Sequence, residues 1–468
     1  MNEVNYDIAI IGAGPAGLSA AVEAANKGSK VVLLESRKFV GGNWGVSYGL
    51  MGVNSPLSKK QGIKINVNKL LNNELRLFNY QVDATLWKDL INSSGDNIAW
   101  LQDQGVEFES EIEPYITSEI SAPVYHRWKK SSQPTRKMQI AFEKAGGTVM
   151  LETKAKKFLM ENGKICGIIA TNKNGNEVQI NCKAAISCGG GYVDNVEWVS
   201  RIVGIEDYEA RNIGDNDGSA IKMSLEAGAR SLMGYETIIA DLIPREMKVA
   251  KDWVNYIHNR PGDHPFHVNV NQDGQRYVDE SCTLKLFGLD PAAAITQLKT
   301  FRVYDEDKLK ELDAFNNTGM YDMLMKAVAD GKYGIFKANT FKELAEHFNL
   351  DPKTFTETMN QYNDYCKAGI DDDFEKNSAY LKEFKPPFYM WENGFQIPAT
   401  FSSLDYNKNM EALNNNRRVI PGLYIAGCDG AKIYRDYYSL AIPGSAMANN
   451  IYTGRKAGEQ ASIYSAKA

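Results

Sequence analysis

The sequence predicts an α/β protein in which a Rossmann-like domain carries an inserted α+β capping domain. The first observation is a glycine motif, G-x-G-x-x-G at positions 12–17, that opens a helix directly after an apolar strand at Asp7–Gly12. The second is a buried-type strand at Val419–Ala426, followed by a terminal helix from Pro443, which returns to the pattern of the first domain. The third is a stretch of charge-rich helical segments between these two regions, which is typical of an insertion.

The spacing of the glycine motif predicts a dinucleotide-binding site. Gly12 permits a tight turn, Gly14 lets the backbone approach a pyrophosphate, and Gly17 lets the helix pack closely against the strand. The helix N-terminus offers free N–H groups and a positive dipole end to the phosphates. A second strand, Lys30–Leu34, ends in Glu35, whose carboxylate would accept hydrogen bonds from a ribose diol. The same charge would repel a 2′-phosphate, which argues against NADP.

The rest of the first domain is predicted to mix helices with strands. Apolar residues at helical spacing indicate a helix over 85–105, and a shorter helix is expected over 217–228. Strands are expected at Thr148–Leu151 and Val178–Ser187. Between them, Asn162-Gly163 separates alternating apolar runs, which predicts a β-hairpin.

The segment that follows differs in character and is predicted to form the capping domain. A second hairpin is expected at His267–Asp279, with its turn at Asp273-Gly274. Two helices are expected within 340–368, and Asp351-Pro352 marks the start of the second. The expected domains are 1–235 for the first part of the nucleotide-binding domain, 236–355 for the cap, and 356–468 for the return of the nucleotide-binding domain.

Composition excludes several classes of function. The chain has 468 residues and a net charge of −5, which is too mild to predict nucleic acid or an anionic membrane as a partner. Its six cysteines include no Cys-x-x-Cys pair, so no iron–sulfur, zinc or dithiol site is expected, and no metal. This cysteine usage fits a reducing compartment, and no signal segment is visible, so a cytoplasmic location is expected. No stretch resembles a membrane span.

Three further segments carry residues suited to contact an extended cofactor. The loop Gly41–Gly49 has glycines that allow backbone contact, and Asn43 and Ser47 can bond to phosphate or sugar groups; alone, it also fits a flexible surface loop. Asp217 can cap the helix that follows it or bind a sugar hydroxyl. Gly444, at the start of the terminal helix, permits close approach of a ring system.

Together these motifs resemble the flavoprotein superfamily that contains the FAD-dependent fumarate reductases and 3-ketosteroid dehydrogenases. The matching segments run in family order over most of the chain: 12–17 with Glu35, Gly41–Asn43, Gly189-Gly190, Asp217-Gly218, Val270–Glu280, and Pro421–Gly427 with Gly444. The resemblance implies noncovalent FAD, a Rossmann-like FAD-binding domain, and a cap whose closure forms the substrate site. The expected FAD contacts are Gly12, Gly14, Pro15, Ala16, Gly17, Glu35, Ser36, Gly42, Asn43, Trp44, Ser47, Tyr48, Gly49, Ala155, Gly189, Asp217, Gly427, Cys428, Asp429, Gly444 and Ser445.

The chain departs from the fumarate-reducing members at several positions that those enzymes use. Leu284 stands where they have a proton-donating arginine, and Tyr437 and Ala441 stand where a His and an Arg hold carboxylates. Cys428 replaces the usual Glu, and Asn43-Trp44 occupies the region where covalently flavinylated relatives have a His. Fumarate is therefore not expected to be the substrate.

The segment before the terminal helix resembles the ketosteroid dehydrogenase side of the superfamily, where a tyrosine stands shortly before the helix glycine. Leu440 aligns with that tyrosine, and Tyr437 and Tyr438 lie just upstream. Tyr437 or Tyr438 is expected to donate a proton, because a phenol with a pKa of about 10 is normally protonated and can act as a general acid. The alternative is that both tyrosines only pack against the helix. Arg435 is expected either to bind a substrate carboxylate or carbonyl, or to pair with Asp436.

The resemblance implies an FAD-dependent oxidoreductase acting on CH–CH bonds, with hydride passing from flavin N5 to an activated C=C bond. We expect an ene-reductase for an enoate or enone other than fumarate. Trp44, Tyr48, Tyr434 and Tyr437 would form an aromatic wall, which favours a flat enone or an aryl-acrylate. The alternatives are a ketosteroid-type dehydrogenase, a non-redox flavin-dependent isomerase or hydratase, and a noncatalytic flavin-binding subunit. The expected partners are a small-molecule substrate and an electron donor that is a reduced nicotinamide, a flavin or a redox protein.

Overall fold

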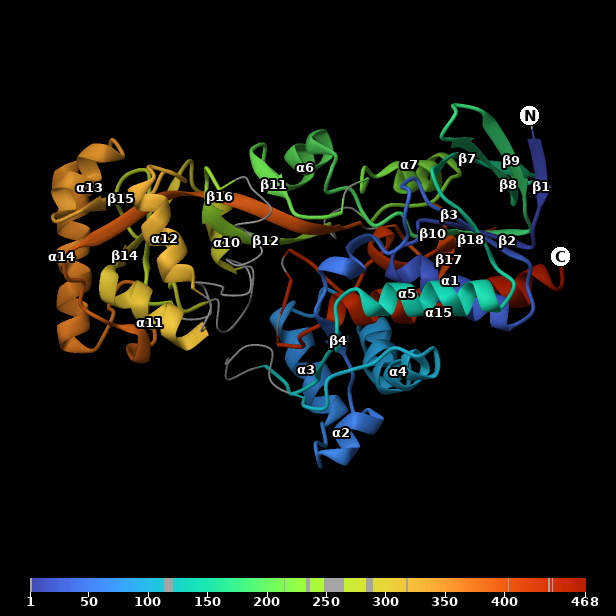
Figure 1. Cartoon of the computed structure of the whole chain (residues 1–468), viewed down its shortest axis with the longest axis horizontal. Helices are drawn as coiled ribbons and strands as arrows, with labels where there is room; N and C mark the ends of the chain where they lie inside the picture. Colours follow the sequence, from blue (N-terminus) through green and yellow to red (C-terminus); the bar gives the residue numbers. More distant parts are fainter. Residues whose placement is uncertain are drawn as a thin grey trace.

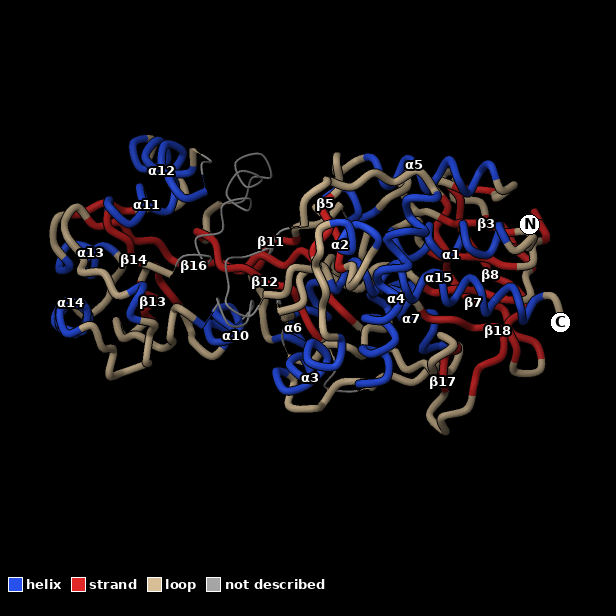
Figure 2. The backbone as a smooth tube through the Cα atoms, turned by 90° about the horizontal axis from the view of Figure 1, so that it is seen from below, coloured by secondary structure: helices blue, strands red, loops and turns tan. Residues whose placement is uncertain are grey.

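Two lobes joined by one long strand make up the molecule (Figure 1). The larger lobe holds both chain ends, which lie at the same end of the molecule (Figure 2). The computed structural model describes residues 2–112, 121–213, 215–232, 236–247, 265–282, 289–316, 319–402, 404–436, 438–439 and 441–468.

The larger lobe is built on a six-stranded sheet that is parallel except for one edge strand. Two of its central strands, at Ile8–Ile11 and Val31–Leu34, are apolar at every position and buried throughout, as strands covered on both faces require. In spatial order the strands are β17 (Glu411–Leu413), β18 (Val419–Ile425), β10 (Ala184–Ser187), β2 (Ile8–Ile11), β3 (Val31–Leu34) and β6 (Thr148–Met150).

Helices cover one face of this sheet, and a second sheet covers the other. The helices are α1 (Pro15–Asn26), α5 (Gln133–Lys144) and α15 (Ser445–Ser465). On the opposite face lie α7 (Ser219–Glu226) and the strands β1 (Asn2–Asn5), β9 (Glu177–Asn181), β8 (Lys164–Asn172) and β7 (Thr153–Glu161). α1 and α15 approach so closely that a Cβ on Gly454 would lie 2.2 Å from the Ala16 carbonyl oxygen.

Two predictions for this lobe need correction, whereas others are confirmed, among them the helix predicted over 217–228, which is α7. The hairpin predicted at Asn162-Gly163 is present as β7 and β8. The single strand predicted over Val178–Ser187 is wrong, because the chain bends at Lys183 and divides it into β9 and β10, which belong to different sheets. The terminal helix begins at Ser445 rather than at Pro443, because the preceding glycine takes up the left-handed conformation at the N-cap.

A small helical unit lies below the central sheet in Figure 1. Its longest helix confirms the helix predicted over 85–105, and the Asp83 side chain caps that helix by accepting hydrogen bonds from the Thr85 and Leu86 N–H groups. The elements of this unit are β4 (Gly49–Met51), α2 (Pro56–Lys60), α3 (Val67–Leu77), α4 (Ala84–Asp103) and β5 (Tyr125–Arg127).

The smaller lobe surrounds the first half of the long strand β16 (Phe388–Phe401). The hairpin predicted at His267–Asp279 is wrong in its return strand: the turn is present, but β13 pairs with β14, and only a bridge joins Val270 to Arg276. The elements of this lobe are β13 (Val268–Asn271), α10 (Leu289–Ile295), β14 (Thr300–Asp305), α11 (Glu306–Asn316), α12 (Met320–Ala329), β15 (Phe336–Ala338), α13 (Phe341–His347) and α14 (Pro352–Ala368).

The long strand β16 belongs to both lobes. Its first residues pair with β14 and β15, and its second half pairs with β11 (Tyr208–Ala210), which follows α6 (Val196–Val203), and with β12 (Thr237–Pro244). α14 begins after an Asp351 cap, as predicted, and packs Phe355 and Met359 into the apolar core of the smaller lobe. We therefore propose that the cap continues through α14 to the first half of β16 rather than ending at residue 355.

Four charged side chains are buried together in the cap. Arg276 donates hydrogen bonds to Asp371 at 2.8 and 2.9 Å and to Glu280 at 2.9 and 3.2 Å. The Lys376 ammonium lies 3.2 Å from Glu280 and donates to the His267 carbonyl oxygen at 2.7 Å. Because a buried charge is costly unless it is paired, this cluster fixes the loop after β13 to the loop after α14.

Candidate active site

The predicted glycine motif forms the turn between β2 and α1. Gly12 has a φ of +94°, and a Cβ there would lie 2.5 Å from the Cys188 carbonyl oxygen. A Cβ on Gly17 would lie 1.8 Å from the Gly12 carbonyl oxygen, so Gly17 sets how closely α1 packs on the turn. A Cβ on Gly14 would meet nothing within 4 Å, because this glycine faces a cleft. The fold requires Gly12 and Gly17, whereas Gly14 leaves room for a ligand.

Helix α1 starts at this cleft with its backbone donors uncapped. Gly14 is the N-cap residue and Pro15 holds the first helical position. Over Pro15–Asn26 the helix has no side-chain cap and no acidic residue in its first turn. Its first N–H groups and the positive end of its dipole are therefore available to an anion. This arrangement fits the diphosphate of a dinucleotide.

Glu35 follows β3 and organises the rim of the cleft. Its Oε2 accepts a hydrogen bond from the Ala13 N–H at 3.0 Å, and its Oε1 accepts one from the Arg37 N–H at 2.9 Å. The neighbouring Ser36 hydroxyl donates to Asp215 at 2.8 Å. The Ser36 hydroxyl also lies 3.3 Å from Oε1, whereas Oε2 keeps a second lone pair, so contact with a ribose remains a prediction that this geometry allows.

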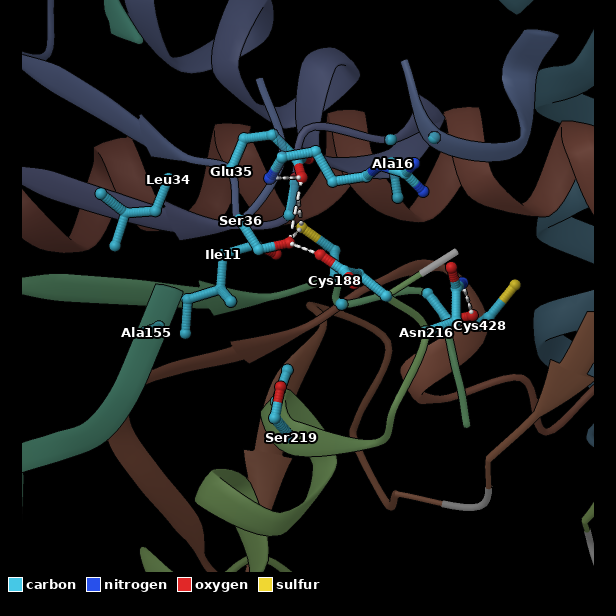
Figure 3. A pocket seen from close by; sticks show the side chains of 18 of the residues that line it. Ile11, Ala16, Leu34, Glu35, Ser36, Ala155, Cys188, Asn216, Ser219 and Cys428 are labelled. Carbon is cyan, nitrogen blue, oxygen red and sulfur yellow. Dashed lines mark hydrogen bonds between the residues drawn. The ribbon is translucent and has the colours of Figure 1, made fainter. Parts of the chain in front are cut away.

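The cleft lies beside the α1 turn, between the ends of the central strands and the start of β7 (Figure 3). Figure 3 shows Glu35 and Ser36 on one wall, Ala155 and Ser219 on another, and Cys188 between them. The predicted contact residues that line the cleft are Gly12, Gly14, Pro15, Ala16, Glu35, Ser36, Gly42, Asn43, Ala155, Gly189 and Cys428.

Asp429 lies behind the cleft and shapes its wall. Its buried Oδ2 accepts hydrogen bonds from the Gly189 N–H at 2.7 Å and the Ser187 hydroxyl at 2.8 Å, and its Oδ1 accepts the N–H groups of Gly190 and Gly191 at 3.1 Å. Burial raises the pKa of this carboxyl, and the hydrogen bonds oppose that shift. Because backbone N–H groups can only donate, the ionised form fits this pocket. Asp429 therefore positions the glycine loop that lines the cleft.

Part of the predicted loop contact lies in the protein interior. Trp44 is fully buried, and its ring packs edge-on against Trp128 with centroids 6.2 Å apart. Ser47 donates its hydroxyl to the Gly49 carbonyl oxygen at 3.2 Å, and the Tyr48 carbonyl oxygen accepts the Trp128 N–H at 2.9 Å. The cleft is not lined by Trp44, Ser47, Tyr48 or Gly49, so their contact with a cofactor stays a prediction.

Near the C-terminus, the predicted glycines serve close packing of the backbone. A Cβ on Gly427 would lie 2.8 Å from the Ala16 Cβ, and one on Gly444 would lie 2.6 Å from the Met51 nitrogen. Asp217 binds Lys154 at 2.6 Å and also accepts the N–H of the first residue of α7. None of Gly17, Asp217, Gly427, Gly444 and Ser445 lines the cleft.

Tyr438 belongs to a buried cluster of rings and hydroxyls at the start of α15. Tyr434 donates its hydroxyl to Ser445 Oγ at 2.9 Å, and Ser445 donates to Tyr438 Oη at 3.4 Å. The Ala446 N–H also donates to Tyr438 Oη at 3.4 Å. The two tyrosine rings lie 5.2 Å apart, and Phe401 stacks on Tyr438 at 6.2 Å.

Of the remaining catalytic candidates, the structure describes Arg435 but not Tyr437. Arg435 lies 3.8 Å from the Asp436 carboxylate, which is the pairing that the sequence left open as an alternative. Tyr437 and Leu284 lie outside the described residues. Two residues predicted to share an aromatic wall have different packing partners: Trp44 packs against Trp128, and Tyr434 packs against Tyr438.

Several residues of the cleft were missed from the sequence. Lys154 and Asn450 lie on β7 and α15, where nothing in the local pattern separates them from ordinary surface or helix residues. Asn216 belongs to an Asp- and Gly-rich strip in which only Asp217 was singled out; its side chain donates to the Gly190 carbonyl oxygen at 2.6 Å. Spatial proximity, rather than a motif, brings these residues to the cleft.

Fold and cleft together define a dinucleotide-binding α/β protein with an inserted cap. Residues 7–441 match the family described as FAD binding domain, and the chain belongs to this family. It is 31% identical to the vinyl phenol reductase of Lactiplantibacillus plantarum, over 98% of this chain and 97% of that protein. It is 24% identical to the NADH:acrylate oxidoreductase of Vibrio harveyi over 98% of this chain, and it spans half of that protein.

A solved structure shows the same fold. The 3-ketosteroid Δ1-dehydrogenase from Sterolibacterium denitrificans, in complex with 1,4-androstadiene-3,17-dione, matches with a TM-score of 0.78 and 16% identity, over 98% of this chain and 99% of that one. The expected membership of the fumarate reductase and ketosteroid dehydrogenase superfamily is confirmed.

The cleft fits FAD, because its uncapped helix N-terminus, the open side of Gly14 and the Glu35 carboxylate suit a diphosphate and a ribose. The protein is an FAD-dependent oxidoreductase, as predicted. Among the helices in the described ranges, none combines the length and apolar character needed to cross a membrane.

Proposed function

We propose that the protein reduces the C=C bond of an aryl-substituted alkene of the vinylphenol or aryl-acrylate type. It thus acts on the CH–CH group of its substrate, with FAD as redox cofactor. The proposal is supported by similarity to a vinyl phenol reductase over nearly the full length of both proteins. A second relative is named for acrylate, which is also an activated alkene.

The buried cluster of Tyr434, Tyr438 and Ser445 is the observation that carries this proposal. It lies in the segment where fumarate-reducing members hold carboxylates with a His and an Arg. Here Ala441 replaces the arginine, and the cluster itself consists of aromatic rings and hydroxyl groups. Rings favour contact with an aryl group, whereas a dicarboxylate needs cationic partners.

Reduced FAD, when bound, supplies the hydride for C=C reduction. The chain must hold the alkene in place and supply a proton to the second carbon. We assign that proton to Tyr438. Its Oη accepts hydrogen bonds from Ser445 and from the Ala446 N–H at the start of α15, and both bonds stabilise the phenolate left after proton transfer. Tyr437 remains a second candidate.

Anaerobic reoxidation of the dithionite-reduced holoenzyme tests the proposal. We expect 4-vinylphenol or 4-hydroxycinnamate to reoxidise the flavin and fumarate to fail. Tyr438→Phe should slow reoxidation by about 10²- to 10⁴-fold. Tyr80→Phe is the control, because Tyr80 is 62% exposed and should leave the rate unchanged.

Other outcomes point to other functions or residues. Bleaching of the oxidised flavin by a saturated 3-ketosteroid would indicate a dehydrogenase. Turnover without net redox change would indicate an isomerase or hydratase. Full turnover in both Tyr437→Phe and Tyr438→Phe would show that neither tyrosine is the acid.

A further inference from the structure

A carboxyl group is buried beside the tyrosine cluster, on the apolar face of α3. Glu74 follows Leu70 and Leu71 by four and three residues, a spacing that places all three on one side of the helix. Its side chain is fully buried, and Oε2 accepts a hydrogen bond from the Ser439 hydroxyl at 3.3 Å. Glu74 thus reaches the residue next to Tyr438.

Among the described residues, one side-chain hydrogen bond is all that offsets the cost of burying an acid at this position. Within the described chain, Ser439 is the one side chain that hydrogen-bonds Glu74, and Oε1 has no partner. A buried, half-satisfied carboxyl destabilises a protein, and a leucine would suit this helix face better. Groups that lower stability in this way are concentrated at functional sites.

Burial also keeps this carboxyl protonated near neutral pH. It raises the pKa of Glu74 from 4.5 to about 8, and the hydrogen bond from Ser439 opposes the shift only in part. Burial is the main cause that raises the pKa of Tyr434, followed by Tyr438; the charge on Glu74 adds a smaller rise. On the adjoining segments, Lys432 lies 2.9 Å from Asp405 and 3.8 Å from Asp83, and Arg435 lies 3.8 Å from Asp436.

We propose that Glu74 is a positioning residue that holds a proton for the hydroxyl cluster of Tyr434, Ser445 and Tyr438. This inference rests on the proposed C=C reduction. In that reaction one π bond is replaced by two C–H bonds, one hydrogen arriving as hydride from the reduced cofactor and the other as a proton. As Tyr438 gives its O–H proton to the substrate carbon, the carboxylic acid returns a proton to the cluster and becomes a carboxylate. Solvent protonates the carboxylate again before the next turnover.

Three variants on one helix separate this role from simple packing. Glu74→Gln keeps size and hydrogen bonding but has no acidic proton, and Glu74→Leu restores an apolar helix face. Arg76→Gln is the control, because it removes a charge from the solvent-exposed side of α3. Each holoenzyme is reduced with dithionite and mixed anaerobically with 4-vinylphenol from pH 5.5 to 10.

In the wild type, the reoxidation rate should fall as pH rises through about 8, where Glu74 loses its proton. Glu74→Gln should lower the rate at pH 7 by about 10- to 100-fold, remove this inflection, and leave the apparent substrate Kd within about 3-fold. Glu74→Leu should stay folded, bind FAD and show the same loss. The inference is overturned if both folded variants keep the wild-type rate and pH profile.

An infrared measurement gives a readout that needs no turnover. At pH 7 the wild type should show the C=O band of a protonated carboxylic acid that is absent from Glu74→Gln and disappears above about pH 8. Absence of this band from the wild type overturns the inference whatever the substrate. Failure of every alkene to reoxidise the wild type would instead overturn the proposed function, while the band still decides whether Glu74 holds a proton.

Discussion

Replacing Asp429 by Asn should disturb the wall of the cleft, because the Asp429 carboxylate holds that wall in place. The carboxylate accepts four hydrogen bonds, two at each oxygen, and three come from the N–H groups of the Gly189–Gly191 loop. In the Asn variant one oxygen becomes an NH₂ group, which faces donors and can accept nothing. Whichever way the amide is oriented, two of the four bonds to the carboxylate are lost, although the Ser187 hydroxyl can turn to accept from the amide and donate to the Ala220 carbonyl oxygen.

The expected cost follows from these bonds. Each hydrogen bond to a charged group contributes about 1.5–3 kcal/mol, so the loss of two costs about 3–6 kcal/mol. Release of a buried charge offsets part of this cost, since burial opposes ionisation of Asp429. We therefore expect a loss of about 3–4 kcal/mol in the free energy of unfolding, and at least a 10-fold rise in the FAD Kd as the glycine loop moves.

Urea unfolding and FAD titration of the apoprotein measure the two effects. Asp436→Asn is the matched control, because its side chain is 70% exposed and its positive φ of 64° suits Asn. It should stay within about 0.5 kcal/mol of the wild type. If Asp429→Asn unfolds at the wild-type midpoint and binds FAD with the wild-type Kd, the positioning role is wrong.

Three other outcomes are expected. Gly14→Ala should keep the free energy of unfolding within about 1 kcal/mol of the wild type but weaken FAD binding. Gly17→Ala should destabilise the protein, because the added Cβ meets a carbonyl oxygen. Equal urea midpoints for the two variants would contradict this expectation. Arg276→Met should destabilise the cap by about 3–5 kcal/mol, because it leaves two buried carboxylates short of a partner. Unchanged thermal unfolding would refute the stabilising role of this buried charge cluster. The pKa of Glu74 is higher in the folded than in the unfolded state, so the contribution of Glu74 to the free energy of unfolding is full below about pH 4.5 and falls by up to about 5 kcal/mol as pH rises to about 8. Glu74→Gln should flatten this slope in denaturation measured at pH 5 and pH 8.5.

Local patterns located the elements that short-range physics controls. The glycine turn before α1, the hairpin at Asn162-Gly163 and the Asp351 cap of α14 each depend on a few neighbouring residues, and the structure contains all three. The division of Val178–Ser187 into β9 and β10 depends instead on which strands lie beside each half. A run of apolar residues contains no information about its pairing partners, so the sequence pattern could not show that this segment forms two strands in different sheets.

The same distinction holds for the site. The sequence by itself determined the glycine turn before α1, because the positive φ of Gly12 and the close packing of Gly17 on Gly12 are properties of the local backbone. Only the tertiary structure decided that Asp429 supports the cleft from behind and that Glu74 lies against the tyrosine cluster. Glu74 is 365 positions from Ser439 in the chain, and no periodicity links residues so far apart. Burial and the neighbours it brings give these carboxyl groups their chemistry, and both exist only once the chain has folded.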